Sequence, residues 1–460
     1  MNILLIIPAA PGDRWVDGPI YLPFPQLAMP TVAAATPPQF KVKILDEKVE
    51  PIGDAPDADI VGITIDTTVA NYAYSLARKF RERGSFVVLG GPHVSVLPHE
   101  AVFHADAVIV GDAEDTWPQF LSDFSSGRSK KIYYSNYPSL SRIKPPRLDL
   151  LKPGAYPTLS ITHASRGCPY HCEFCCIPAL SGNCYRHRPI EEVAKEVEAH
   201  DGLLTIFWDD NLTADRKYAR QLFTALKPLK KRWIGQATIL FALNRALVKQ
   251  AAGAGCIGLF LGIESFSTES LKEAKKGFNP TERYGEGIRN LHDHGIAVDA
   301  GVIFGFDHDD PAVFERTLDA AASLRLDCVN FNILTPFPGT PLYVRLKKEG
   351  RLLTRDWSYF QPYKNVVFQP KQMTPHQLFN GYLRAAKNYY RTWPILKRVF
   401  FTPWFLSTKR LSWFMNFQLR KNIPLTFSDA FPADGATNNE GLIEKRGQIE
   451  KSIGIQSDRT

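Results

Sequence analysis

The chain has 460 residues, a formal net charge of +8 and seven cysteines, and 44% of its residues are hydrophobic while 22% are charged. This length predicts two or three domains, and the composition excludes a disordered or fibrous chain. Three of the seven cysteines are clustered, which indicates a reducing compartment and excludes a disulfide scaffold. No apolar run approaches the roughly 20 residues that span a bilayer. We therefore expect a cytoplasmic protein, with peripheral contact to the inner face of the membrane left open.

Residues 1–135 alternate short apolar runs with amphipathic segments. Continuous apolar runs of this length are typical of parallel strands that are buried on both faces. The clearest helix is predicted over residues 69–83, whose apolar residues share one face. The expected strands cover residues 3–7, 42–45, 60–64, 86–89 and 107–110. This alternation predicts an α/β domain with an open, doubly wound (Rossmann-like) sheet.

Small and polar residues follow the last two of these strands. Gly90, Gly91 and His93 come after the fourth strand, and Gly111 and Glu114 come after the fifth. Ligands of such sheets bind outside the carboxyl ends of the strands, and glycine lets the backbone approach a large flat ligand. We predict that these five residues contact a cofactor, although His93 could equally be an ordinary polar residue of the loop.

Residues 136–157 contain several prolines and are predicted to be a linker. A strand over residues 158–162 then leads into a loop in which Cys168, Cys172 and Cys175 form a C-x3-C-x2-C pattern. Three thiolates can bind three irons of a [4Fe–4S] cluster and leave the fourth iron open, whereas a closed electron carrier would want four cysteines. The alternative is a zinc site, in which a neighbouring residue would supply the fourth ligand.

The cysteine pattern, with Phe174 before its last member, resembles the signature of radical S-adenosylmethionine (SAM) enzymes. The resemblance implies that Cys168, Cys172 and Cys175 bind a [4Fe–4S] cluster and that SAM chelates the open iron. One electron would then cleave SAM to methionine and a 5′-deoxyadenosyl radical, so an external reductant of the flavodoxin or ferredoxin type is implied. Arg166, just before the loop, would either stabilise the anionic cluster or pair with a carboxylate.

Residues 158–345 repeat a strand–helix unit six times, which predicts a partial (β/α)6 barrel with its reactive groups at the carboxyl ends of the strands. The expected strands cover residues 158–162, 204–208, 233–238, 257–262, 297–303 and 328–334. Asp209 and Asn211 end the second strand, and Gly262, Glu264 and Ser265 end the fourth. The hydroxyls and sulfonium of SAM need acceptors in a largely dry cavity. These five residues are therefore the predicted SAM contacts, and the alternative for each is a residue of the barrel rim that is satisfied by the backbone.

The first domain resembles the cobalamin-binding domain that precedes many radical SAM domains. The matching segments are residues 22–37, 46–47, 61–64, 90–100 and 105–114. The D-x-H-x-x-G motif is absent, so the resemblance implies cobalamin held without a histidine ligand from the protein. The chain is identified as a member of the cobalamin-binding radical SAM enzymes of the class B methyltransferase kind. Its segment 330–343 is similar to one in hopanoid methylases and the anaerobic magnesium-protoporphyrin ester cyclase.

The C-terminal part, residues 346–427, is basic and aromatic. No Asp or Glu occurs between Trp357 and Ser428, while aromatic residues alternate with Lys and Arg. A helical lid that packs on the barrel, an amphipathic surface for a membrane, and a nucleic-acid surface all fit this composition. We favour the lid over the membrane, and nucleic acid is disfavoured because no RNA-binding motif is present.

Helices are predicted in this part over residues 376–390 and 408–419. Pro394 and Pro403 are expected to break the chain between them. The polar residues 428–460 are predicted to be disordered.

These observations together predict an enzyme that methylates an unactivated carbon of a small molecule. The resemblance implies that one SAM methylates reduced cobalamin and that a second yields the radical that takes hydrogen from the substrate. The basic aromatic C-terminus favours a hydrophobic or anionic substrate such as a lipid or a tetrapyrrole. Three alternatives stay open: a radical cyclase, oxidase or carbon–carbon coupling enzyme, a tRNA methylthiotransferase-like enzyme, and a non-enzymatic cobalamin or redox sensor. The second would normally need further cysteines before Cys168, and there are none.

Overall fold

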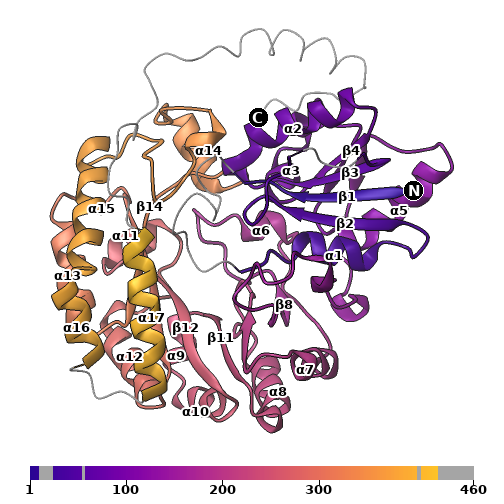
Figure 1. The fold of residues 1–460 in the computed structure, drawn as a ribbon. Helices are drawn as coiled ribbons and strands as arrows, with labels where there is room; N and C mark the ends of the chain where they lie inside the picture. Colours follow the sequence, from indigo (N-terminus) through magenta and orange to yellow (C-terminus); the bar gives the residue numbers. More distant parts are fainter. Residues whose placement is uncertain (10–23, 54–56, 401–405, 423–460) are drawn as a thin grey trace.

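The computed structural model describes residues 1–9, 24–53, 57–400 and 406–422. Two six-stranded parallel sheets form its framework, one from each half of the chain (Figure 1). The predicted disordered tail, residues 428–460, lies outside the described residues. No helix in the described ranges combines the length and the apolar character needed to cross a bilayer.

The N-terminal sheet has the strand order β2-β1-β3-β4-β5-β6, and every pair is parallel. Apolar side chains cover both of its faces, so the sheet lies between two cores. Helices α2 and α3 cover one face, and α1 and α5 cover the other (Figure 1). The strands are β1 Asn2–Ile7, β2 Lys41–Asp46, β3 Ile60–Thr64, β4 Phe86–Gly90, β5 Ala107–Val110 and β6 Ile132–Tyr134, and the helices are α1 Ala28–Ala35, α2 Ala70–Glu82, α3 Pro92–Val96, α4 Pro98–Ala101 and α5 Ala113–Ser125. The predicted doubly wound sheet is confirmed, and the short strand β6 was not predicted.

The second sheet has the order β14-β13-β12-β11-β10-β7, and it is a partial barrel because β14 and β7 are not paired. Its strands are β7 Ile161–Thr162, β10 Leu204–Phe207, β11 Arg232–Ala237, β12 Cys256–Glu264, β13 Ala297–Phe304 and β14 Cys328–Ile333. The helices between them are α6 Ile177–Leu180, α7 Ile190–Ala199, α8 Arg216–Leu226, α9 Ile239–Ala242, α10 Arg245–Gly253, α11 Thr268–Glu273, α12 Tyr284–His292 and α13 Val313–Ser323. A two-stranded ribbon of β8 Ser165–Arg166 and β9 Arg186–His187 flanks the loop that holds the clustered cysteines. The predicted six-unit barrel is thus confirmed.

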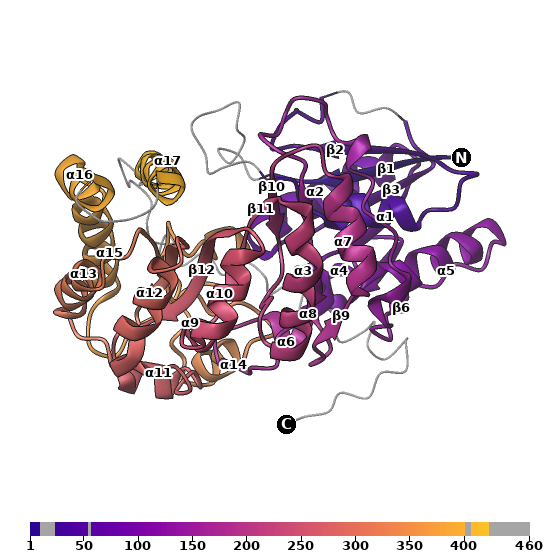
Figure 2. The same cartoon turned by 90° about the horizontal axis from the view of Figure 1, so that it is seen from below.

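The C-terminal part is helical and consists of α14 Pro341–Lys348, α15 Pro375–Tyr389, α16 Thr392–Phe400 and α17 Leu406–Asn422. A capping box between Thr374 and Gln377 begins α15. The predicted break at Pro394 is wrong in part: α15 does end before it, but Pro394 lies in the first turn of α16, where proline is tolerated. Helix α17 lies across β12, β13 and β14 (Figures 1 and 2).

A buried amide docks α17 onto the barrel. Asn416 is completely buried, and its Nδ2 donates to the carbonyl of Asp327 at 2.9 Å. Its Oδ1 accepts from Nη2 of Arg398 on α16 at 2.6 Å, and the Arg398 guanidinium lies 3.8 Å from the ring centre of Tyr389 on α15. The three last helices therefore form one cap that is fixed to the start of β14.

Between the barrel and this cap, the chain returns to the N-terminal domain. Trp357, Phe360 and Val367 are buried in the core on the α2 face of the first sheet. The Trp357 indole donates to Glu100 at 2.9 Å. The two sheets are thus joined by this returning segment as well as by the chain that leads from one to the other.

Candidate functional site

The clustered cysteines lie on a loop that begins at the end of β8. Gly167 opens the loop with φ +85°, and a Cβ there would collide with the carbonyl of Cys184, so only glycine fits. The loop backbone is held from both sides, since Glu173 N donates to Ala274 O at 2.9 Å and Leu342 N donates to Glu173 O at 3.0 Å. The loop is therefore built by contacts from distant parts of the barrel.

The three predicted cluster ligands come together in this loop. Cys172 is buried, and Cys168 and Cys175 are partly buried. Burial raises the pKa of Cys172 to about 11 and that of Cys175 still further, and the neighbouring thiols add to both shifts. The sulfurs thus lie within electrostatic range of one another, although no group of three His, Cys, Asp or Glu side chains in the described part has the spacing of a metal site. Three thiols on one loop, with Asn211 Nδ2 3.7 Å from the Cys168 sulfur, fit a [4Fe–4S] cluster with an open iron.

A buried ion pair lies beside these thiols. Glu264, the last residue of β12, has φ +64°, and its carboxylate accepts from Lys276 Nζ at 2.6 Å. Burial lowers the pKa of Lys276, but Glu264 and the thiols of Cys172 and Cys175 outweigh it, and the net shift is upward. A Cβ on Gly262 would lie 2.5 Å from the Glu264 carboxylate and 2.7 Å from Nζ, so a larger residue there would displace the ion pair. The lysine places a positive charge next to the site of an anionic cluster.

The side chains of Asp209 and Ser265 form hydrogen bonds with other residues of the chain. The Asp209 carboxylate is fully buried and accepts from Ala164 N at 3.1 Å, Ser165 N at 2.5 Å and Ser165 Oγ at 2.6 Å. Burial, only partly offset by these bonds, raises the pKa of Asp209 to about 7. Ser265 Oγ accepts from Ser267 N at 3.1 Å. Asp209 therefore positions the strand that enters the cysteine loop, and Ser265 shapes the turn after β12.

In the N-terminal domain, Gly91 and His93 also make close contacts with neighbouring residues of the chain. Gly91 has φ +95°, and a Cβ there would lie 2.6 Å from Ile65 N. His93 is completely buried, with Nδ1 3.2 Å from Thr67 Oγ1 and Nε2 3.3 Å from Glu100 Oε1. Gly90 ends β4 beside these residues. The structure thus shows internal partners for both nitrogens of His93.

The predicted residues after β5 lie at the contact between the two domains. Arg166 pairs with Glu114 at 2.5 Å and with Asp112 at 3.3 Å, and Arg186 pairs with Asp112 at 2.7 Å. Of the two roles left open for Arg166, the structure thus shows the pair with carboxylates. Gly111 has φ +83° and leads into this charged group.

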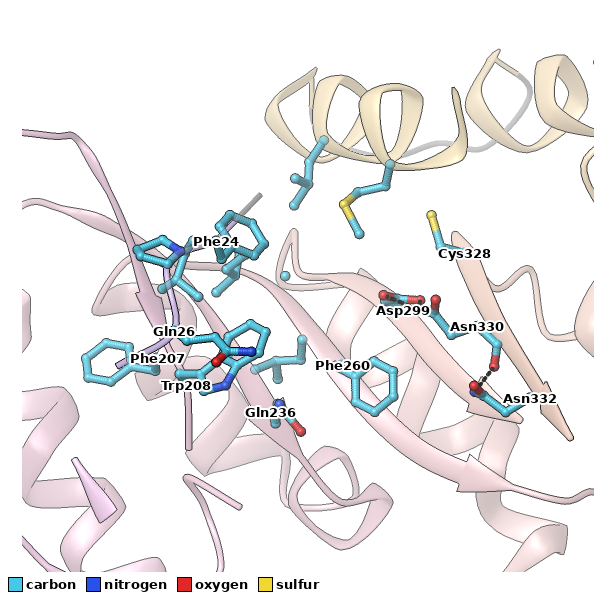
Figure 3. A pocket seen from close by; sticks show the side chains of 18 of the residues that line it. Phe24, Gln26, Phe207, Trp208, Gln236, Phe260, Asp299, Cys328, Asn330 and Asn332 are labelled. Atoms are coloured by element: carbon cyan, nitrogen blue, oxygen red, sulfur yellow. Dashed lines mark hydrogen bonds between the residues drawn. The ribbon is translucent and has the colours of Figure 1, made fainter. Parts of the chain in front are cut away.

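A cavity of about 710 Å³ lies between the carboxyl ends of the N-terminal strands and the interior of the barrel (Figure 3). The N-terminal domain contributes residues that follow β1, β2 and β3, and α17 closes the opposite end with Leu411, Ser412 and Met415. Among the described residues, its lining includes no histidine and none of the clustered cysteines. Placement at the strand ends, together with His93 being paired elsewhere, fits cobalamin held without a histidine ligand.

Three features of the site were not predicted from the sequence. Lys276 comes after its partner Glu264 in the chain, and the residues between them contain no recognisable motif. Arg345 on α14 reaches back to Glu173, which lies inside the cysteine motif. The position of Glu173 was a usable signal, because a carboxylate between two cluster ligands needs a cationic partner. Asp299, in the barrel interior, carried no such signal.

The comparisons with known proteins agree with this geometry. The chain matches the B12 binding domain over residues 17–121, the Radical SAM superfamily over residues 162–321 and a domain of unknown function (DUF4070) over residues 340–416. It is 31% identical to bacteriochlorophyllide d C-12(1)-methyltransferase of Chlorobaculum tepidum, over 91% of this chain and 92% of that protein. It is 28% identical to hopanoid C-2 methylase of Rhodopseudomonas palustris, over 72% of this chain and 66% of that protein.

Among solved structures, the fold is similar to that of the radical SAM methyltransferase TsrM from Kitasatospora setae with tryptophan and an aza analogue of SAM. The TM-score is 0.66 at 17% identity, over 84% of this chain and 88% of that one. The cysteine loop, the two sheets and these matches lead to one conclusion: the chain belongs to the cobalamin-dependent radical SAM methyltransferase family, whose cofactors are a [4Fe–4S] cluster, SAM and cobalamin.

Proposed function

We propose that this enzyme methylates an unactivated carbon of an extended, largely hydrophobic small molecule of the tetrapyrrole kind. The observation that carries the proposal is the cavity between the two domains, which is lined mostly by apolar side chains (Figure 3). Trp208 lies in that lining with 53% of its surface exposed, and its ring is 6.1 Å from that of Phe24. Exposed aromatic faces in a cavity favour a flat, apolar ligand. The similarity to a bacteriochlorophyllide methyltransferase supports the same substrate class.

The residues of the chain have distinct tasks in this proposal. When bound, the cluster and SAM supply a radical that takes hydrogen from the substrate, and cobalamin carries the methyl group. Cys168, Cys172 and Cys175 would hold the cluster, and Lys276 would offset its charge. The apolar walls of the cavity and the cap formed by α17 exclude water from the reacting groups. Placing the cavity between the two cofactor domains brings substrate and both cofactors into one enclosed space.

The proposal is tested by anaerobic reconstitution with iron, sulfide and hydroxocobalamin, followed by turnover with SAM that carries a deuterated methyl group. A chemical reductant is supplied, because radical SAM enzymes require an external electron donor. Bacteriochlorophyllides and hopanoids form the substrate panel. We expect 5′-deoxyadenosine together with a tetrapyrrole product that is heavier by one labelled methyl group.

Two variants separate the cluster from general stability. Cys172→Ala should lose both products, whereas Cys184→Ala, at an exposed thiol outside the motif, should keep both. Deoxyadenosine without a methylated product from any member of the panel would reject methylation of these substrates and leave the radical step standing. A labelled hopanoid with unlabelled tetrapyrroles would reject the tetrapyrrole class.

The exposed surface of α16 and α17 supports a further part of the proposal, peripheral contact of a cytoplasmic enzyme with a membrane. Trp393, Trp413 and Phe414 are 67%, 39% and 43% exposed. Arg391 and Lys397 are exposed on the same cap. Aromatic and basic side chains together favour the headgroup region of an anionic bilayer. Replacing the three aromatic residues by serine should reduce binding to phosphatidylglycerol vesicles, and unchanged binding would reject this contact.

A further inference from the structure

A carboxylate lies inside the barrel cavity, and the described part of the chain provides it with no cationic partner. Asp299 on β13 accepts from Asn330 Nδ2 at 2.8 Å through each of its two oxygens. The residue as a whole is partly exposed, although Figure 3 shows it in the interior and below α17. A carboxylate offers about four acceptor positions, and a single amide nitrogen leaves the others open toward the cavity. A buried charge in this state is costly unless something else donates to it.

The neighbouring carboxylate, Asp327, is less accessible, because this residue is only 3% exposed. Its Oδ2 accepts from His292 Nε2 at 2.9 Å and from Val298 N at 2.9 Å. It also lies close enough to Asp299 to raise the pKa of that carboxyl, which burial brings to about 7. Of these two carboxylates inside the barrel, Asp299 is therefore the more accessible to a ligand in the cavity.

The rest of the lining contains little that would receive an anion. Lys48 is the one basic side chain among the described residues that line the cavity, and it belongs to the N-terminal domain. Inside the barrel the polar lining includes Asp299, Asn330, Asn332 and, on β11, Gln236 (Figure 3), together with the less exposed Asp327. The Gln236 amide has no hydrogen-bond partner within the described ranges of the chain. Apolar side chains make up most of the remaining wall.

Asp299 also lies far from the expected position of SAM. Phe260 on β12 pairs in register with Asp299, and Glu264, beside the cluster loop, lies four residues further along β12. At about 3.3 Å per strand residue this places Asp299 roughly 13 Å below the rim. A group bound to Asp299 is thus at the end of the cavity away from the cluster.

We propose that Asp299 is a substrate-binding residue that accepts a hydrogen bond from a hydroxyl or ammonium group at the end of the substrate that lies deepest in the barrel. Any carboxylate of the substrate then lies outward, toward the N-terminal domain. This inference deepens the proposed function, on which it rests, by assigning the orientation of the substrate. It also gives a role to the accessible carboxylate of Asp299 in a largely apolar barrel interior.

The test uses the full chain loaded with cluster and cobalamin, without reductant, and three probes that share one aromatic body. These are 1-naphthylmethylamine, 1-naphthalenemethanol and 1-naphthoate, with binding followed by calorimetry. We expect the amine and the alcohol to bind at least about tenfold more tightly than the carboxylate, as a charged hydrogen bond would give. The difference between amine and alcohol tells whether the preferred donor is cationic or neutral.

Two variants and one control decide the outcome. Asp299→Asn should remove most of the preference, while Asp310→Asn, at an exposed carboxylate, should leave it unchanged. Met415→Trp fills the cavity from α17 and should weaken all three probes by about tenfold or more. If Asp299→Asn fails to load its cluster, the wild-type preference together with the weaker binding of all three probes to Met415→Trp decides.

Equal affinity of the wild-type protein for all three probes would overturn the proposal. So would a preference that survives in Asp299→Asn, or binding to Met415→Trp at wild-type strength. Because no turnover is measured, a failure of methyl transfer leaves this result intact, and a failure of probe selectivity leaves methyl transfer intact.

Discussion

Replacing Arg345 by glutamine should loosen the cysteine loop from outside the motif. Arg345 Nε and Nη2 donate to the two oxygens of Glu173 at 2.8 and 3.0 Å. Its Nη1 donates to Asp307 at 2.8 Å, and Nη2 also reaches Glu273 at 3.1 Å. One guanidinium thus ties α14, the end of α11, the loop after β13 and the cluster loop together.

The size of the effect follows from how far these groups are shielded from water. The Arg345 side chain is 25% exposed and that of Glu173 is 11% exposed. Breaking a fully buried ion pair costs about 3–5 kcal/mol, and an exposed pair is worth below about 1 kcal/mol. Asp307 keeps Arg351 and Lys371 as partners in Arg345→Gln, so it contributes little to the loss in the free energy of unfolding. Glu173 has no other cationic partner in the described chain, and we expect a loss of about 2–3 kcal/mol, between the two limits.

The assay is urea unfolding of the apo-protein under anaerobic conditions, together with iron content after reconstitution and gel filtration. Arg345→Gln should lower both the free energy of unfolding and the retained iron. The matched control is Arg316→Gln, which removes a pair between side chains that are 57% and 46% exposed and should cost at most about 0.5 kcal/mol.

A double variant sharpens the reasoning. Most of the loss is assigned to an uncompensated carboxylate, so Glu173→Gln added to Arg345→Gln should recover part of the stability. Equal stability and iron content in Arg345→Gln and Arg316→Gln would refute the assigned role of Arg345. A double variant less stable than Arg345→Gln would refute the assignment of the loss to Glu173.

Three further predictions concern other parts of the site. Lys276→Met should retain iron but shift the reduction potential of the cluster to more negative values, because a buried cation near the cluster is lost. The control Lys275→Met, at an exposed neighbour, should leave the potential unchanged. Spectroelectrochemical titration compares the two variants. Asn416→Leu should weaken the docking of α17 by about 2–3 kcal/mol, since buried polar partners lose their bonds, and trypsin should then cleave within α17 faster than in the wild-type protein. Burial raises the pKa of Asp299 from 3.8 to about 7, so the folded protein retains a proton there that the unfolded chain releases. Its contribution to the free energy of unfolding therefore falls as pH rises from about 4 to about 7, and urea titrations across that range should show a flatter dependence in Asp299→Asn.

The sequence predicted those parts of the site whose members lie close together in the chain. Cys168, Cys172 and Cys175 share one loop, so their spacing alone indicated a cluster. Apolar runs that form strands buried on both faces likewise predicted both sheets, because burial dictates their composition.

For residues whose roles depend on distant partners, the sequence predicted their position at strand ends but not the residues with which they pair. Asp209 and Glu114 do lie at strand ends, as predicted, yet their carboxylates are taken up by Ser165 and Arg166. A strand-end position predicts that a side chain reaches the rim of a sheet. It does not specify which segment from elsewhere in the chain arrives to pair with it, and that is why Lys276 went unnoticed.

The returning segment that includes Trp357, Phe360 and Val367 has a consequence for biosynthesis. These side chains complete an apolar core whose other members are made hundreds of residues earlier. During translation the first sheet therefore leaves the ribosome with part of its covering missing, and it can be finished only after the whole barrel has been synthesised. The two halves of this enzyme consequently mature as a single unit, and a corrin meets its complete binding surface only once the barrel beside it is also in place.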